Sequence, residues 1–352
     1  MQEMVEHAGY PFVAGGEPDE AEIAPIRERL PIAPPAEASR IGNRELFGRL
    51  ATTAMLPGME RTIAEWQPDL VLRDPCGYAS AVVAARVGVS IAQVAISLAE
   101  AEMGSIHVAA PALETHRAGL VDELRASPYL TRFPAALDPS PFPRTYRFAE
   151  PDSDPGPRAA LPDWWDGSEA PLVYLTFGTG LGYMTMATDI YRIVLAAVAD
   201  LPIRVLLTTG PQTDRSGIGP GPANVHVEPW VDQRDAFAAA DLVVCHGGSG
   251  TVFGALAAGV PTVVVPVFAD QFENGRRIAA SGAGLTIETE PTRPDAPRTV
   301  ITLDDGPRIA TTITAALGSP SLGTEARRIA SEMAAAPSID DLLADLTGST
   351  PA

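Results

Sequence analysis

Short apolar runs, each followed by a turn and a helical pattern, constrain the fold of this chain most strongly. In the second half they read PLVYLTFGT (171–179), IRVLLTTG (203–210), DLVVCH (241–246) and PTVVVPV (261–267). Near-continuous Val, Leu and Ile, rather than strict alternation, is typical of parallel strands covered on both faces. The pattern predicts an α/β domain with a doubly wound, Rossmann-like sheet.

The first half carries the same pattern in a weaker form. PDLVLRD (68–74) and SIAQVAI (90–96) read as strands, and a small-residue helix over 80–87 lies between them. Strand, helix and strand in this order indicate a right-handed parallel crossover. The chain begins with the end of a helix and a strand over 11–13, so we expect this domain to be incomplete at its start, lacking about 30–50 residues of a strand–helix–strand unit.

The 352 residues suffice for two domains, and proline marks the division between them. We expect an N-terminal domain over 1–133, a linker over 134–170, a C-terminal domain over 171–320 and a terminal helix over 321–352. Prolines exclude regular helix or central strand from most of the linker. Trp164 and Trp165, within it, read as anchors onto a domain surface.

Composition excludes several functions. The net charge of −19 disfavours a nucleic-acid partner, because phosphate backbones require a basic face. The apolar runs are strand-length, so no membrane span is expected. Two cysteines, Cys76 and Cys245, make neither a disulfide framework nor a thiol zinc site, which favours the cytoplasm.

The turn GGSGT (247–251) is the first candidate site. It follows a strand and opens a helix, so its N–H groups and the helix dipole favour an anion such as phosphate. The glycines let the backbone approach closely, and Ser249 and Thr251 add hydroxyls. A plain strand–helix turn with a Ser/Thr cap, for which Thr251 is a candidate, is the alternative. His246, ending the strand beside the turn, favours the anion site, because its imidazole can donate to a diphosphate oxygen.

The segment FADQFEN (268–274) follows the next strand and is expected at the same rim of the sheet. Asp270 and Gln271 offer a carboxylate and an amide to vicinal hydroxyls, as a sugar requires. Asp270 is also placed to cap the following helix, with Glu273 completing a capping box. An anion site beside a hydroxyl site predicts a nucleotide-sugar ligand.

Taken in order, WVDQ (230–233), HGGSGT (246–251), GVP (259–261) and DQFEN (270–274) resemble the donor-binding signature of GT-B nucleotide-sugar glycosyltransferases. The likeness is strongest to bacterial antibiotic and macrolide glycosyltransferases and covers 171–290 well. It implies that Trp230 stacks on the base and that Val231 contacts it through the backbone. It also implies that His246, Gly248, Gly250 and Thr251 hold the diphosphate, that Thr179 offers a hydroxyl on the phosphate side, and that Asp270 and Gln271 hold the sugar.

The chain departs from that signature at two places. Related plant enzymes carry a ribose-binding glutamate where this chain has Gly254, which favours a dTDP-sugar over a UDP-sugar. The family's general base, a histidine near the start, has no counterpart here. The position matching its orienting partner is Asp74, whose alternative role is to cap a turn. We do not expect His7, His107, His116 or His226 to replace the base.

The resemblance implies an inverting, metal-independent transfer of a sugar or deoxysugar to a hydroxyl of an apolar natural product. No cofactor or metal is expected, since the Asp-Ser-Asp at 152–154 lies in the linker. The alternatives are a non-catalytic nucleotide-sugar-binding protein that assists another transferase, or a sugar-nucleotide 2-epimerase. A homodimer or an auxiliary partner is left open.

Overall fold

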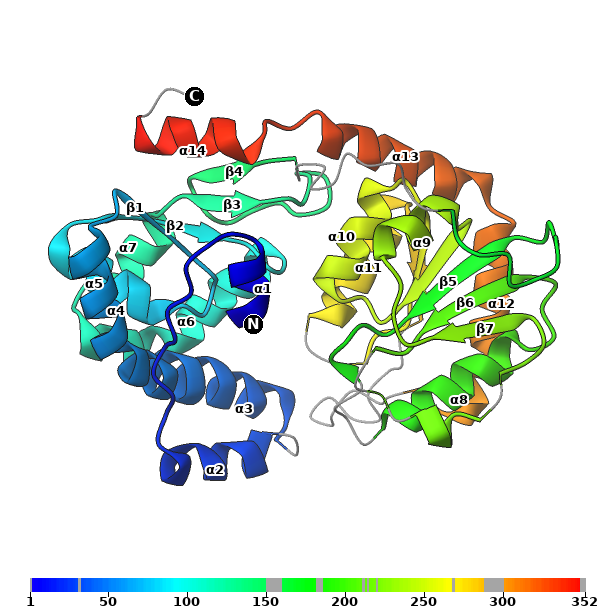
Figure 1. Cartoon of the computed structure of the whole chain (residues 1–352), viewed down its shortest axis with the longest axis horizontal. Helices are drawn as coiled ribbons and strands as arrows, with labels where there is room; N and C mark the ends of the chain where they lie inside the picture. The colour runs from blue at the N-terminus through cyan, green and yellow to red at the C-terminus, as the bar shows by residue number, and fades with distance from the viewer. Residues whose placement is uncertain are drawn as a thin grey trace. The chain divides into compact units, whose positions relative to one another are not determined.

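The computed structural model describes residues 2–30, 33–149, 160–181, 186–210, 213, 215–219, 221–267, 270–287 and 301–348, without the side chains of Pro35 and Ser216. The chain forms two compact units (Figure 1). Unit 1 contains 1–131, 139–147 and 340–352, and unit 2 contains 132–138 and 148–339. The Asp-Ser-Asp at 152–154 lies outside the described residues.

Unit 2 is built on a six-stranded parallel sheet of order β10-β9-β8-β5-β6-β7. Its strands are β5 (Leu172–Thr176), β6 (Arg204–Thr208), β7 (Val225–Glu228), β8 (Leu242–Cys245), β9 (Thr262–Val264) and β10 (Gly284–Thr286). The chain runs outward from β5 to β7 and then returns to the other side of β5 with β8. The strand order therefore reverses between β5 and β8, where open α/β sheets place their ligands.

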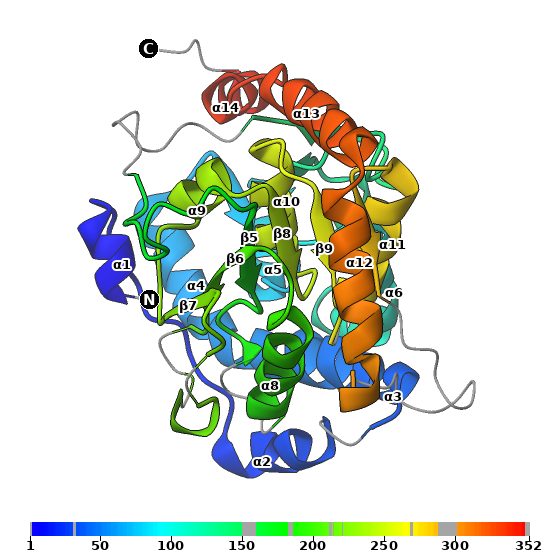
Figure 2. The same cartoon turned by 90° about the vertical axis from the view of Figure 1, so that its right-hand side faces the viewer.

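Helices cover both faces of this sheet (Figures 1 and 2). They are α8 (Ala187–Val198), α9 (Gln233–Ala239), α10 (Ser249–Ala257), α11 (Gln271–Ser281), α12 (Gly306–Leu317) and α13 (Pro320–Ala334), with short 3₁₀ turns η4 (Arg215–Gly217) and η5 (Leu303–Asp305). Val173 and Leu175 of β5 join the core under α8 and α12. Tyr174, between them, faces Phe237 of α9. Alternate residues of one buried strand thus serve opposite faces.

Unit 1 has a four-stranded parallel sheet of order β1-β2-β3-β4. Its strands are β1 (Leu70–Arg73), β2 (Ser90–Val94), β3 (Tyr129–Thr131) and β4 (Thr145–Arg147). Its helices are α1 (Gln2–His7), α2 (Glu20–Arg29), α3 (Pro35–Ser39), the π-helical η2 (Arg40–Ala51), α4 (Thr52–Trp66), α5 (Tyr78–Val87), α6 (Ala99–His116), α7 (Leu120–Ala126) and most of α14 (Ile339–Thr347). The expectation of parallel sheets flanked by helices is confirmed for both units.

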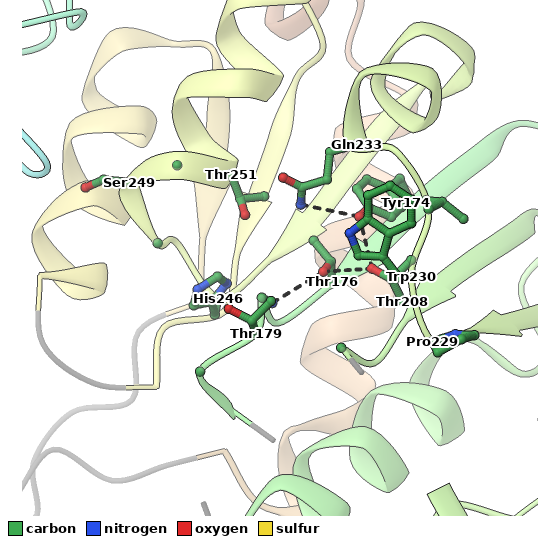
Figure 3. Close-up of a pocket in the computed structure, with 16 residues that line it drawn as sticks. Tyr174, Thr176, Thr179, Thr208, Pro229, Trp230, Gln233, His246, Ser249 and Thr251 are labelled. Atoms are coloured by element: carbon green, nitrogen blue, oxygen red, sulfur yellow. Dashed lines mark hydrogen bonds between the residues drawn. The ribbon is translucent and has the colours of Figure 1, made fainter. Parts of the chain in front are cut away.

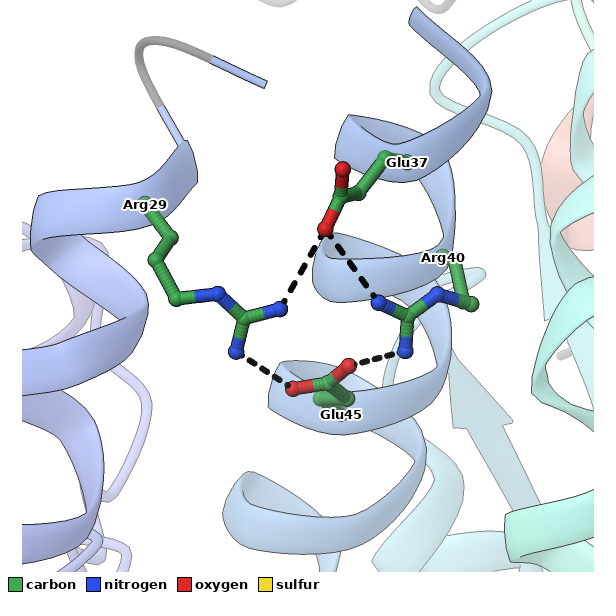
Figure 4. A network of polar contacts seen from close by, with 4 residues as sticks. All are labelled: Arg29, Glu37, Arg40 and Glu45. Carbon is green, nitrogen blue, oxygen red and sulfur yellow. Dashed lines mark hydrogen bonds and ion pairs between the residues drawn. The ribbon is translucent and has the colours of Figure 1, made fainter. Parts of the chain in front are cut away.

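A ring of four charges ties α2 to α3 and η2 at the start of unit 1 (Figure 4). Arg29 lies 3.5 Å from Glu37 and 3.4 Å from Glu45, and Arg40 contacts the same two carboxylates. An apolar cluster that includes Ile26, Ile41 and Leu50 packs these helices together. Because the charged groups are partly exposed, the ring orients the helices and the apolar cluster holds them.

Two local expectations were wrong. Residues 11–13 form no strand; nearby, the backbone at Gly16 lies so close to α4 that a Cβ there would stand 2.1 Å from the carbonyl oxygen of Ala54. The terminal helix is two helices, α13 and α14, because Pro337 falls between them. Within the proline-rich linker, β4 forms at the edge of the sheet, where a proline beforehand costs no ladder hydrogen bond, so it does not conflict with the expected absence of a central strand.

Candidate functional site

A cavity of about 500 Å³ opens at the carboxyl ends of β5, β6 and β8, beside the reversal of strand order (Figure 3). Its lining residues come from four turns of unit 2 and are Tyr174, Thr176, Gly178, Thr179, Gly180, Thr208, Gly210, Pro229, Trp230, Val231, Gln233, His246, Gly248, Ser249, Gly250 and Thr251. Eight of the ten donor-binding residues expected from the sequence lie in this lining: Thr179, Trp230, Val231, His246, Gly248, Ser249, Gly250 and Thr251.

The turn after β8 presents the start of α10 to the cavity. The N-cap of α10 is Gly248, which has no side chain to satisfy the first N–H groups of the helix. Thr251 lies inside the helix and is buried, so the alternative in which it caps α10 is wrong. Unpaired N–H groups at a helix start bind anions well, because the helix dipole adds to their charge.

The ring of His246 leaves no room for side chains at two glycines around it. A Cβ at Gly178 would stand 2.9 Å from Cε1 of His246, and one at Gly248 would stand 2.4 Å from its Nε2. Gly178 also has a positive φ of 67°. The histidine is thus fixed between the turns after β5 and β8, at the point where the sheet reverses.

Burial lowers the pKa of His246 to about 4, and the carboxylate of Asp270 opposes this shift. At neutral pH the imidazole is therefore uncharged, with one nitrogen carrying hydrogen and the other an open acceptor. A neutral ring can donate one hydrogen bond to an anion without bringing a positive charge into the cavity.

A chain of hydroxyl groups crosses the floor of the cavity (Figure 3). The Gln233 amide donates to Tyr174 (3.4 Å), whose hydroxyl lies 2.9 Å from that of Thr208. Thr208 donates to Thr176 (2.9 Å), which also accepts from the N–H of Gly178 (3.3 Å). The sequence analysis assigned none of these five residues to the site, although Gln233 lies in the WVDQ motif and the two threonines end their strands.

Trp230 lies at the mouth of the cavity with 65% of its surface exposed. An exposed tryptophan beside polar groups provides a flat apolar face on which a heterocyclic base can stack. The neighbouring Val231 contributes to the same wall.

Asp270 and Gln271 lie outside the cavity lining, behind the turn after β8. Asp270 Oδ2 accepts from Ser249 Oγ at 2.9 Å. Gln271 is buried, and its Oε1 accepts from the N–H of Val267 at 2.9 Å. Asp270 makes no cap bond to α11, so the expected capping box is wrong; its carboxylate points to Ser249 instead.

The position of Gly254 has a local explanation. A Cβ there would stand 2.5 Å from Cε2 of Phe237, so the ring of Phe237 fills the space a larger side chain would need. Phe237 in turn packs edge-on against Tyr174, at 5.6 Å between ring centres.

The linker tryptophans anchor to unit 2, as expected. Trp164 stacks on His226 at 4.2 Å between ring centres, and Trp165 donates to the carbonyl of Asn224 at 3.1 Å. The Nε2 of His226 forms a hydrogen bond with Oε1 of Glu228 at 2.8 Å.

In unit 1, Asp74 is exposed in the turn between β1 and α5, where its Oδ1 accepts from the N–H of Cys76 at 2.8 Å. This is the turn-capping geometry left open as its alternative role. His107 contacts Arg125 and His116 contacts the carbonyl of Gly48. Among the hydrogen bonds of the described residues, none joins Asp74 to a histidine.

The cysteines, possible metal ligands and possible membrane spans were also checked in the described residues. Cys76 and Cys245 are free thiols, and burial raises the pKa of Cys245 to about 12. In the part of the chain that the structure describes, no three His, Cys, Asp or Glu side chains gather as metal ligands would. No described helix has both the length and the apolar character that a bilayer crossing demands.

The sequence of the chain is similar to a family model and to known proteins. Residues 192–348 match the family model "Erythromycin biosynthesis protein CIII-like, C-terminal domain". The chain is 30% identical over 271 residues to L-demethylnoviosyl transferase of Streptomyces niveus, a match covering 72% of this chain and 66% of that protein. It is 36% identical over 136 residues to a PGL/p-HBAD biosynthesis rhamnosyltransferase of Mycobacterium bovis, covering 38% of this chain. That match spans only 28% of the length of the rhamnosyltransferase.

Solved structures share the fold. The glycosyltransferase SnogD from Streptomyces nogalater superimposes with a TM-score of 0.75 at 24% identity, covering 99% of this chain and 89% of that one. The spinosyn rhamnosyltransferase SpnG complexed with thymidine diphosphate gives a TM-score of 0.75 at 21% identity, covering 98% and 89%. Residues 192–348 of the chain therefore match the C-terminal domain of the erythromycin biosynthesis protein CIII-like family, and the chain has the GT-B fold seen in antibiotic glycosyltransferases.

Proposed function

We propose that unit 2 binds the nucleoside diphosphate of a dTDP- or UDP-sugar and that this chain transfers the sugar to a hydroxyl of an apolar natural product. The observation that carries the proposal is the cavity at the sheet reversal, where an uncapped helix start, a neutral histidine and an exposed tryptophan meet. The diphosphate would lie on the N–H groups of Gly248–Thr251, and the base would stack on Trp230.

The related structures support a thymidine nucleotide in particular. SpnG is described in complex with thymidine diphosphate, and relatives by sequence include a mycarosyltransferase of Streptomyces fradiae. The space at Gly254 is closed by Phe237, so no carboxylate stands there for a ribose hydroxyl. A deoxyribose has one hydroxyl fewer to satisfy, which favours dTDP over UDP.

The proposed transfer is a direct displacement that inverts the anomeric carbon without metal. The leaving diphosphate gains negative charge as the glycosidic bond breaks, and fixed N–H donors at a helix start stabilise that charge. His246 would add one neutral donor. The acceptor hydroxyl needs a general base, which we do not assign to any residue of this chain.

A non-catalytic role, binding a nucleotide sugar beside another transferase, is favoured by one observation. The resemblance implies that Asp74 orients the general base. In the structure its Oδ1 instead accepts a hydrogen bond from the N–H of Cys76 in an exposed turn. Turnover of a nucleotide sugar to free nucleotide in the presence of purified chain and a panel of apolar aglycones would decide against this alternative.

The test of the proposed site is calorimetric titration of the folded chain with dTDP and UDP, beside His246→Ala and Trp230→Ala. We expect dTDP to bind more tightly than UDP and each substitution to weaken binding about tenfold or more, since each removes a contact of about 1–3 kcal/mol. If neither nucleotide binds the wild-type chain, whose fold circular dichroism verifies, the proposed function fails.

A further inference from the structure

Asn274 of α11 is buried, 2% exposed, and its side chain reaches the turn after β8. Its Nδ2 lies 2.7 Å from the carbonyl of Gly247 and 3.1 Å from the hydroxyl of Ser249. The same nitrogen lies 3.3 Å from Oδ2 of Asp270. One amide thus faces acceptors from two separate loops.

These contacts converge on the carboxylate of Asp270. Its Oδ2 receives the Ser249 hydroxyl at 2.9 Å as well as the amide of Asn274. Donors fix the direction of a carboxylate, and hydrogen bonds to a charged group are worth more than neutral ones. Gly247, the other acceptor, has a positive φ of 87° and leads into the N-cap of α10.

The two loops would meet different parts of the ligand. The turn 247–251 lines the cavity that we assign to the nucleoside diphosphate, whereas Asp270 stands behind Ser249. Displacement of either loop relative to the other would misplace one ligand group while leaving the other in position.

We propose that Asn274 is a positioning residue that ties the phosphate turn to Asp270, so that sugar recognition depends on the geometry of the diphosphate site. The inference rests on the proposed function. It predicts that Asn274 contributes more to the affinity for a nucleotide sugar than to the affinity for the nucleotide alone.

Asn274→Asp is the sharpest variant. It keeps the shape of the side chain but replaces the donor with an acceptor, and sets a second carboxylate beside that of Asp270. Like charges at this separation repel, so the carboxylate of Asp270 should turn away from its present position. Asn274→Ala removes the tie without adding charge.

The experiment measures, by calorimetry, the affinity for dTDP, dTDP-glucose and dTDP-L-rhamnose. It compares wild type, Asn274→Asp, Asn274→Ala, Asp270→Ala and the double variant Asp270→Ala/Asn274→Ala. The preference is the affinity for a dTDP-sugar divided by the affinity for dTDP, taken for the sugar that the wild type binds more tightly than dTDP. We expect Asn274→Asp to reduce this ratio about tenfold, as loss of a charged hydrogen bond should. In the Asp270→Ala background, Asn274→Ala should change the preference less than about twofold.

Asn224→Ala is the matched control. The Nδ2 of Asn224 donates to the carbonyls of Val198 (3.0 Å) and Leu201 (3.3 Å), away from the cavity lining. The Oδ1 atoms of both asparagines are buried without a partner in the described part of the chain. Asn224→Ala should lower the melting temperature but keep the wild-type preference.

The outcomes separate the two proposals. If wild type binds no nucleotide, the proposed function fails. If wild type binds dTDP but prefers neither sugar, or if Asn274→Asp keeps the preference, the inference about Asn274 is overturned and the nucleotide site stands. Equal effects of Asn274→Ala with and without Asp270 would also overturn it, because they would show a merely structural role.

Discussion

At the scale of single residues, His246 makes the stability of the fold depend on pH. Its pKa of about 4 lies below the ordinary value of 6.5, so the unfolded chain binds a proton here before the folded chain does. Stability is therefore lost as pH falls through this window. We expect the free energy of unfolding to drop by about 2 kcal/mol more in wild type than in His246→Gln between pH 7 and pH 5. Urea denaturation at the two pH values measures this; equal losses would contradict it.

The hydroxyl chain under the cavity makes a second prediction at this scale. Tyr174→Phe removes the group that joins Gln233 to Thr208, and we expect the affinity for dTDP to fall about fivefold, the value of one hydrogen bond. Tyr191→Phe is the control, because that buried hydroxyl donates to the carbonyl of Thr209 and does not line the cavity. Titration calorimetry compares them, and equal losses in both would argue against a role for the chain.

At the scale of elements, β1 is an edge strand of unit 1 in the described part of the chain, and Leu72 on it is 43% exposed. An exposed apolar edge pairs with other chains. We expect Leu72→Lys to lower self-association at micromolar concentration, measured by sedimentation velocity, with unchanged dTDP affinity.

A control for this edge lies in Val87, which ends α5 and is 60% exposed but has no strand backbone to offer. Val87→Lys should leave sedimentation unchanged. If both substitutions act alike, exposed apolar area rather than the strand edge drives association.

At the scale of the whole molecule, the division into two units predicts two unfolding events. Trp66 belongs to unit 1, and Trp164, Trp165 and Trp230 belong to unit 2. In a Trp66→Phe variant, fluorescence therefore reports on unit 2 alone. We expect saturating dTDP to raise the urea midpoint seen by fluorescence and to leave one of the two transitions seen by circular dichroism in place. A single coincident transition would contradict this.

The sequence predicted the sheet of unit 2 better than the details of its site. Runs such as that ending in Cys245 are typical of buried parallel strands, and strand ends locate the turns of the cavity. Side-chain partners were less accessible. Asp270 suits a helix cap by spacing, yet its carboxylate accepts hydrogen bonds from Ser249 at the start of α10 and from Asn274 within α11. Such choices depend on tertiary geometry that no local pattern contains.

The same limit applies to elements outside the apolar pattern. Residues 11–13 read as a strand from composition, but a strand needs a neighbouring edge, and the backbone there runs toward α4 instead. The break at Pro337 divides one expected helix so that α14 joins unit 1 and α13 joins unit 2.

The contact between Gly254 and Phe237 also limits the order in which substitutions at these two positions can be made. A glutamate at 254, the ribose-binding residue of related plant enzymes, would collide with the Phe237 ring. A smaller residue at 237 would have to come first, and it would withdraw the edge contact to Tyr174. A variant with only the smaller residue at 237 therefore lacks this contact and gains no ribose-binding carboxylate. In a directed-evolution library for a ribose nucleotide, positions 237 and 254 should be changed together.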